Sequence, residues 1–152
     1  MIPFKKIVCP TDFSEPSYEA LKAANELAVY FRAELVVVHV VPPIPTTSVA
    51  PPTEPGGWDI SGYRRQLDES SRRSLDEVVK ERVAPEVQVR PMVVEGDAAY
   101  QIVKIAEEEG ADLVVIATHG HTGLRHLVFG SVAEKVVRLA PCPVLTIHPP
   151  RQ

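Results

Sequence analysis

The segment that decides the fold, residues 111–132, reads ADLVVIATHGHTGLRHLVFGSV. Its first part, 113–117, is a short run of apolar, mostly β-branched residues, which is typical of a strand buried on both faces. Thr118 and the glycines after it interrupt this pattern, and a helical pattern begins at Gly130-Ser131. The sequence therefore predicts a buried strand, a glycine-containing loop and then a helix N-terminus.

A loop of this kind is suited to binding phosphate. Free backbone N–H groups and the positive end of the helix dipole meet at a helix N-terminus. Gly120 and Gly130 let the main chain approach a ligand closely, and Ser131 adds a hydroxyl donor. Together with Val132 these residues form the predicted phosphate site. The alternative is an ordinary helix N-cap at Ser131 with nothing bound.

The remaining sequence alternates strand and helix patterns. We expect four further strands, at 6–9, 35–41, 87–94 and 143–147. We also expect three helices before the one at 131–139: the first is capped by Ser14, and the next two lie at 59–83 and 97–109. We expect Arg82 on the inner stripe of its helix and residues 107–109 as a solvated helix end. This alternation in 152 residues indicates one α/β domain, 1–152, with a parallel sheet and helices on both faces. Residues 42–57 are proline-rich and are expected to form an irregular, flexible loop.

Composition excludes several classes of partner. The net charge is −4 without a block of like charge, which argues against a nucleic acid or an anionic membrane as a partner. Residues 35–53 are uncharged but contain five prolines, so we expect no membrane-spanning helix. The N-terminus lacks the features of a signal peptide, and we expect no export. Cys9 and Cys142 have no metal-like spacing and fit a reducing compartment as inert thiols.

The spacing Ala117-x2-Gly120-x9-Gly130-Ser131 resembles the signature Gly-x2-Gly-x9-Gly-Ser/Thr of the universal stress protein family. Ala117 stands where the ATP-binding members usually carry glycine. The resemblance also covers the Pro-Thr-Asp-Phe-Ser opening at 10–14 and the closing Pro-Cys-Pro-Val-Leu at 141–145. It implies a five-stranded parallel sheet in the order 3-2-1-4-5, similar to the adenine nucleotide alpha hydrolases. Strands one and four are then neighbours, and ligands bind at the carboxyl ends of strands at such a switch point.

The resemblance implies a cytoplasmic protein that binds ATP, with or without Mg²⁺, or another adenine nucleotide, and acts as a sensor or regulator in the stress response. Asp12 would bind the ribose hydroxyls, or else would cap the following helix. Main-chain groups at Val40 and Val41 would meet the adenine, or else would be ordinary buried strand. Family members commonly form homodimers, which implies an interface through Pro143–Ile147, with residues 42–57 as a flap beside the adenine. The implied nucleotide-binding residues are Pro10, Thr11, Asp12, Val40, Ile116, Ala117, His119, Gly120, Gly130, Ser131 and Val132.

Two other functional classes stay open. One is a family member that binds no nucleotide and works through protein contacts, which Ala117 favours; the other is a slow ATP hydrolase. The sequence contains no P-loop motif and no general base that spacing identifies, so we predict no catalytic residues. His119, His121 and His126 lack a fourth ligand at fixed spacing, so we expect no metal site. His121, Arg125 and His126 either lie along a polyphosphate tail or are solvated.

Overall fold

The computed structural model describes residues 2–44, 60–120 and 129–149. These residues form the predicted alternation of strands and helices, and most bounds lie close to the predicted ones. The elements are β1 (Lys6–Pro10), α1 (Glu15–Phe31), β2 (Glu34–Val41), α2 (Ile60–Arg82), β3 (Val89–Glu95), α3 (Ala98–Glu108), β4 (Leu113–Ala117), α4 (Ser131–Leu139) and β5 (Val144–Ile147). β3 begins later than predicted because Val87, although buried, belongs to a turn in which its N–H donates to the carbonyl of Ala84 (3.0 Å).

The five strands form one parallel sheet in the order β3-β2-β1-β4-β5. This confirms the predicted fold class and strand order. β3 and β5 are the edge strands, and the position of β3 explains Pro91. Proline cannot donate a ladder hydrogen bond, so it is tolerated in a strand that has a neighbour on one side only.

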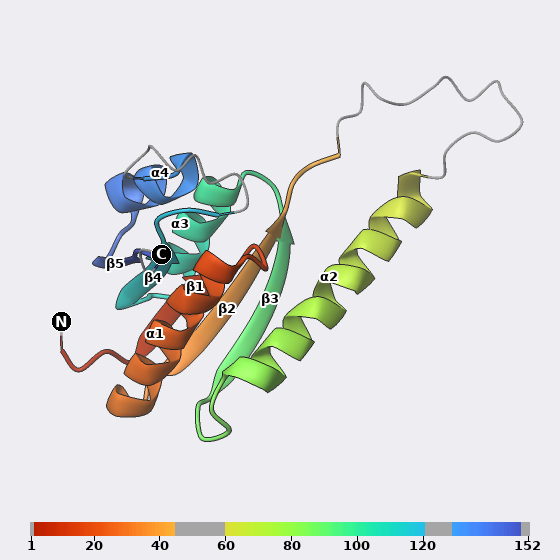
Figure 1. Ribbon diagram of the computed structural model, residues 1–152. Coiled ribbons are helices and arrows are strands. Elements are labelled where there is room, and N and C mark those ends of the chain that lie inside the picture. Colours follow the sequence, from red (N-terminus) through yellow and green to blue (C-terminus); the bar gives the residue numbers. More distant parts are fainter. Residues whose placement is uncertain (1, 45–59, 121–128, 150–152) are drawn as a thin grey trace, which may run out of the picture.

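Helices cover both faces of the sheet (Figure 1), and the alternation of side chains along each strand produces two cores. Ile7, Cys9 and Val115 face α1 and α2, whereas Val8 and Val114 face α3 and α4. The cores continue into the helices through mostly small and aliphatic residues. The strands are therefore buried on both sides, as the unbroken apolar runs predict.

The predicted helix starts at Ser14 and Asp97 are confirmed by their hydrogen bonds. The Ser14 hydroxyl accepts from the N–H of Ser17 (3.4 Å), and the Asp97 carboxylate accepts from the N–H of Tyr100 (2.9 Å). The predicted place of Arg82 on the inner stripe of α2 was wrong.

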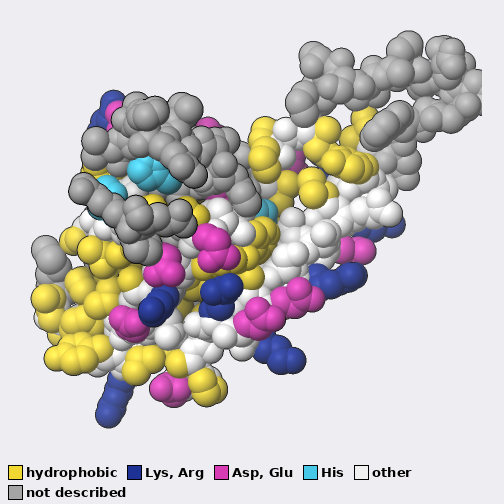
Figure 2. Space-filling view, in the orientation of Figure 1, with side chains coloured by type: hydrophobic (Ala, Val, Ile, Leu, Met, Phe, Trp, Pro, Cys, Tyr) yellow, Lys and Arg dark blue, Asp and Glu magenta, His cyan; other side chains and the backbone are white. Residues whose placement is uncertain are grey.

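Arg82 is exposed, and its guanidinium lies 3.9 Å from the ring centroid of Tyr18. This cation–π contact lets the Arg82 side chain pack at the rim of the core while its charge stays in solvent. Acidic and basic side chains alternate over the outer surface of α2 (Figure 2). No helix in the described ranges is long and apolar enough to cross a membrane.

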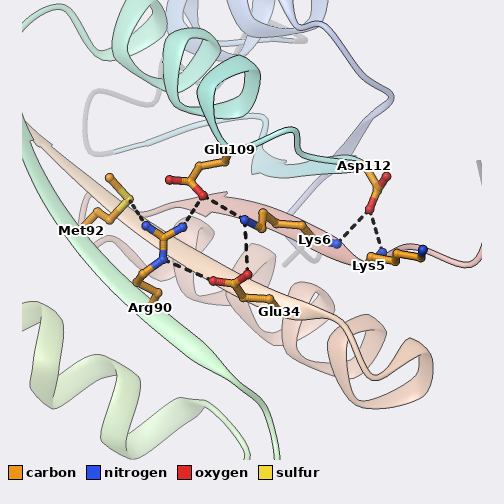
Figure 3. A network of polar contacts seen from close by, with 7 residues as sticks. All are labelled: Lys5, Lys6, Glu34, Arg90, Met92, Glu109 and Asp112. Atoms are coloured by element: carbon orange, nitrogen blue, oxygen red, sulfur yellow. Dashed lines mark hydrogen bonds and ion pairs between the residues drawn. The ribbon is translucent and has the colours of Figure 1, made fainter.

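The expectation of a solvated helix end at 107–109 was wrong for Glu109. Its carboxylate contacts the Nζ of Lys6 (3.0 Å) and the guanidinium of Arg90, and Glu34 contacts the same two cations at 3.3 Å each (Figure 3). We call these four residues the ion-pair ring. The ring joins the start of three strands to the end of α3 at the amino edge of the sheet. Beside it, Asp112 accepts from the backbone N–H groups of Lys5 and Lys6.

Candidate functional site

Two loops meet at the carboxyl ends of β1 and β4. These strands are hydrogen-bonded neighbours, but the chain leaves β1 toward α1 on one face of the sheet and leaves β4 toward α4 on the other. A switch of this kind opens a crevice at the edge of the sheet. A cavity of about 210 Å³ lies there.

The cavity is lined by the eleven nucleotide-binding residues that the family resemblance implied: Pro10, Thr11, Asp12, Val40, Ile116, Ala117, His119, Gly120, Gly130, Ser131 and Val132. It also contains residues that sequence reasoning missed: Ser17, Val38, Ala98, Ile102, Thr118 and Ala133. Ser17 lies three residues after the helix cap Ser14, so its place in the first turn of α1, next to the predicted site, could have been inferred from the sequence. Ala98 and Ile102 look like ordinary core helix, and the fold alone brings them here. His121, Arg125, His126 and residues 45–59 lie outside the described residues.

The turn between β1 and α1 is held by Thr11. Its N–H donates to the carbonyl of Val38 in β2 (2.8 Å), and its hydroxyl accepts from the N–H of Phe13 (3.1 Å) and lies 2.9 Å from the hydroxyl of Ser17. Phe13 has a left-handed φ of 63° and its ring lies against that of His39. The turn is therefore fixed by contacts on both sides before any ligand is present.

Asp12 takes part in this turn and also lines the cavity. Its Oδ1 accepts from the N–H of Ser14 (3.1 Å) and from the Ser14 hydroxyl. This is the local turn anticipated as the alternative to ribose binding, but the side chain that caps α1 is that of Ser14 and not that of Asp12. The two roles involve one carboxylate, and they do not exclude each other. Gly120 lies against the same group, since a Cβ at Gly120 would overlap Oδ2 of Asp12.

The N-terminus of α4 forms the third wall. Gly130 is the N-cap, and no side chain of the described residues caps the helix. The N–H of Gly130 is occupied because it donates to the carbonyl of Thr118 (2.6 Å), and the first bond inside the helix runs from Glu134 N–H to the Gly130 carbonyl. The donors at the cavity are therefore the first helical N–H groups, at Ser131, Val132 and Ala133, and not that of Gly130.

The remaining wall is apolar and comes from β2, α3 and β4, through Val38, Val40, Ala98, Ile102 and Ile116. Of the two β2 residues named from the sequence, only Val40 lines the cavity. The carbonyl of Val41 accepts instead from the N–H of Gly96 (3.0 Å) and continues the pairing with β3. The cavity thus has an apolar end at β2 and a polar end at α4.

The sequence profile of the universal stress protein family matches residues 3–148. The chain belongs to this family. Universal stress protein MJ0531 of Methanocaldococcus jannaschii is 39% identical to it, over 98% of this chain and 85% of its own length. The solved structure of MJ0577 from the same organism has a TM-score of 0.82 at 28% identity, covering 99% of this chain and 100% of that one. A universal stress protein of Archaeoglobus fulgidus in complex with dAMP, 23% identical and covering 97% and 99%, has a TM-score of 0.61 and shows the fold alone.

Within this universal stress protein fold, Ala117 is placed at the end of β4. It is 8% exposed, and its side chain belongs to the core cluster on the α1 face, together with Cys9 and Val115. The preceding residue, Ile116, faces the other core. The added methyl relative to glycine therefore fills core volume beside α1.

The ionisable side chains that line the cavity in the described residues are those of Asp12 and His119. Nowhere in the ranges 2–44, 60–120 and 129–149 do three or more His, Cys, Asp or Glu side chains gather to hold a metal ion. Both cysteines are free; burial raises the pKa of the Cys9 thiol to about 12 and also raises the pKa of Cys142. A protonated thiol is a poor nucleophile and metal ligand.

Proposed function

We propose that this universal stress protein binds ATP or another adenine nucleotide in the cavity and acts as a sensor or regulator in the stress response. One observation carries the proposal: an uncapped helix N-terminus, a carboxylate and an apolar slot line a single cavity at the switch point. The helix N-terminus suits a phosphate, the carboxylate suits the ribose hydroxyls, and the apolar slot suits a base.

The roles follow the position of each wall. The N–H groups of Ser131, Val132 and Ala133 would bind phosphate oxygens, and Asp12 would accept from the ribose. Val40, with the other apolar residues at the β2 end, would contact the adenine. The Archaeoglobus fulgidus protein of the same fold was solved in complex with dAMP, which is consistent with a nucleotide ligand for this chain.

Thermal unfolding of the nucleotide-stripped protein tests the proposal, with ATP, AMP and GTP, each with and without Mg²⁺. A ligand at about a hundred times its Kd adds ~2.7 kcal/mol. At this chain length that raises Tm by roughly 5–10 °C. The variant Ser131→Glu puts a carboxylate at the first helical position, which suits the helix dipole but repels a phosphate. We expect its folding to be preserved and its nucleotide-induced shift to be lost.

Ser70→Glu is the matched control, because Ser70 is exposed on α2 and the charge change is the same. It should keep the full shift. The proposal is overturned if no nucleotide raises Tm at millimolar concentration, or if Ser131→Glu and Ser70→Glu respond equally. A shift that requires Mg²⁺ would add the metal to the bound species.

We also propose that two copies pair through β5, whose outer edge has no neighbouring strand in the described sheet. Leu145 is 39% exposed on β5, and Val137 and Leu139 are exposed on α4 next to it. An unpaired edge with apolar side chains favours association. Sedimentation of the Leu145→Lys variant, expected to be monomeric where the unchanged protein is dimeric, tests this.

We propose a cytoplasmic location, in line with the two free cysteines, to be checked by cell fractionation.

Neither alternative gains a specific observation. Ala117 favoured a member that binds no nucleotide, but its methyl packs in the α1-side core. A hydrolase needs a group that activates water; Asp12 is engaged in a turn, which leaves His119 as the general-base candidate among the described cavity residues. Phosphate release from ATP, compared between the unchanged protein and Ser131→Glu, distinguishes turnover at this site from contamination.

A further inference from the structure

The described side chains that line the cavity offer little positive charge for a phosphate. Among its described lining residues there is no Lys or Arg, Asp12 is acidic, and His119 is the residue whose side chain can carry a positive charge. Imidazole is the side chain whose charge ordinarily changes between pH 5 and 8. Among the described lining residues, the side-chain charge that would favour a phosphate therefore comes from this imidazole when it holds a proton.

The ring of His119 is held in place by Thr118. Thr118 is completely buried; its N–H donates to the carbonyl of Ile147 (3.0 Å) and its carbonyl accepts from Gly130 (2.6 Å). Its hydroxyl Oγ1 lies 3.0 Å from Nδ1 of His119 and 3.1 Å from Nδ1 of His148. Main-chain bonds on both sides of Thr118 thus fix a hydroxyl between two imidazoles, one of them at the cavity wall.

This arrangement accommodates both charge states of His119. A hydroxyl donates one hydrogen bond and accepts two. When both rings are protonated, both Nδ1–H groups donate to Oγ1, and the hydroxyl proton is directed to the Ile147 carbonyl, 3.4 Å away. When His119 is neutral with its proton on Nε2, the hydroxyl donates to Nδ1. The ring therefore keeps its position while its charge changes.

We propose that His119 is a specificity-determining residue that recognises phosphate charge in this cavity, with Thr118 and His148 as positioning residues. The inference rests on the proposed function and deepens it. A phosphorylated adenosine binds more tightly when His119 is protonated, whereas adenosine itself gains nothing. The contribution of His119 to the affinity for AMP and ATP therefore falls as pH rises from 6 to 8, and with it the part of the preference for nucleotide over nucleoside that His119 provides.

Few other groups near the ring in the described chain add to this pH dependence. Asp12 lies across the cavity, and carboxyl groups ordinarily titrate well below pH 6. On α4, Glu134 is paired with Arg138. His148 lies across Thr118 and is also an imidazole, so its contribution is tested separately by His148→Asn.

The experiment is calorimetric titration of the full, nucleotide-stripped protein with adenosine, AMP and ATP at pH 6, 7 and 8, for the unchanged protein and for His119→Asn. The Asn amide provides a hydrogen-bonding atom near the position of Nδ1 but cannot be protonated. Both proteins meet the same ligand at the same pH, so the ratio of their two affinities, and not either affinity alone, reports on His119. We expect the unchanged protein to bind AMP about tenfold more tightly than His119→Asn at pH 6, which is equivalent to one pKa unit. This ratio should decline toward one at pH 8. His119→Gln replaces the variant if His119→Asn fails to fold.

Two further readouts separate recognition from a structural role. In Thr118→Val the hydroxyl is lost at nearly constant volume, and the pH dependence for AMP should shrink. Ring nitrogen NMR should show His119 becoming doubly protonated on addition of AMP at pH 7, and not on addition of adenosine. A pH-independent ratio, or an equal pH dependence for adenosine, overturns the role of His119 alone. Failure of the unchanged protein to bind any of the three ligands overturns the proposed function instead.

Discussion

The ion-pair ring allows a stability prediction whose size can be worked from the structure. In Glu109→Gln the charge is lost while the shape is kept. The Glu109 carboxylate contacts two cations, and its side chain is 19% exposed, against 25% for Lys6 and 42% for Arg90. These pairs lie between exposed ion pairs, worth about 0.2–1 kcal/mol each, and buried ones, where removing a partner costs about 3–5 kcal/mol. Glu34 still contacts both cations in the variant, so neither is left unpaired, and we expect a loss of about 1–2 kcal/mol.

Thermal and urea unfolding at pH 7 measure this loss. At roughly 2–4 °C per kcal/mol for a chain of this size, Tm should fall by about 2–8 °C. Glu108→Gln is the matched control: the neighbouring side chain is 62% exposed and forms one long pair with Lys104 at 3.7 Å. Its variant should lose at most about 0.5 kcal/mol.

The pH dependence gives the sharper test. Hydrogen bonds from Arg90 and then Lys6 lower the pKa of Glu109 in the folded protein. A carboxyl with a lowered folded pKa stabilises fully above its unfolded pKa, about 4.3, and loses this contribution as pH falls through the folded value. The difference between the unchanged protein and Glu109→Gln should therefore narrow below about pH 4. The assigned role of the ring would be refuted if Glu109→Gln and Glu108→Gln lost equal stability. It would also be refuted if the stability difference between the unchanged protein and Glu109→Gln stayed constant into strong acid.

Three further predictions concern single residues. Gly120→Ala places a methyl on Oδ2 of Asp12, so calorimetry should show nucleotide affinity at least about tenfold weaker, since two loops must separate to accept it. Ala117→Gly removes a core methyl and loosens β4, which should cost about 1 kcal/mol or more in urea unfolding while changing nucleotide affinity less than Gly120→Ala does. Because its thiol is completely buried and its pKa is raised to about 12, Cys9 should resist iodoacetamide at pH 8 in the native protein and react fully in urea, as mass spectrometry would show.

The features that could be predicted from the sequence are those that local patterns encode. The run Leu113–Ala117 had to be a buried strand because nothing in it is polar, and the glycine and serine at 130–131 had to start a helix. Two cavity walls followed from these patterns and from the turn after β1. The sequence could not show that the N–H of Gly130 is already occupied, because its partner is the carbonyl of Thr118 on the other side of the loop.

What could not be predicted depends on residues far apart in the chain. Glu109 meets Arg90 across 19 residues and Lys6 across 103, so its own helix shows only an apparently unfavourable acidic end. Ala98 and Ile102 line the cavity only because the sheet order places α3 over the carboxyl edge of β2. The link between His119 and His148 requires β4 and β5 to end side by side, which no local pattern records.

The direction of the strands separates the two charged regions of the molecule. In a parallel sheet the starts of all strands lie at one edge and their ends at the other. The ion-pair ring occupies the starting edge, where Lys6 and Arg90 are neutralised by Glu34 and Glu109, and α3, about 16 Å long, runs from that edge to the cavity. The basic residues of the ring are thus remote from the cavity, where the positive potential of the described wall comes from backbone N–H groups and, in our proposal, from a protonated His119. Backbone N–H donors carry no charge that changes with pH, so within the described wall a pH-dependent contribution to the proposed nucleotide affinity would act through His119.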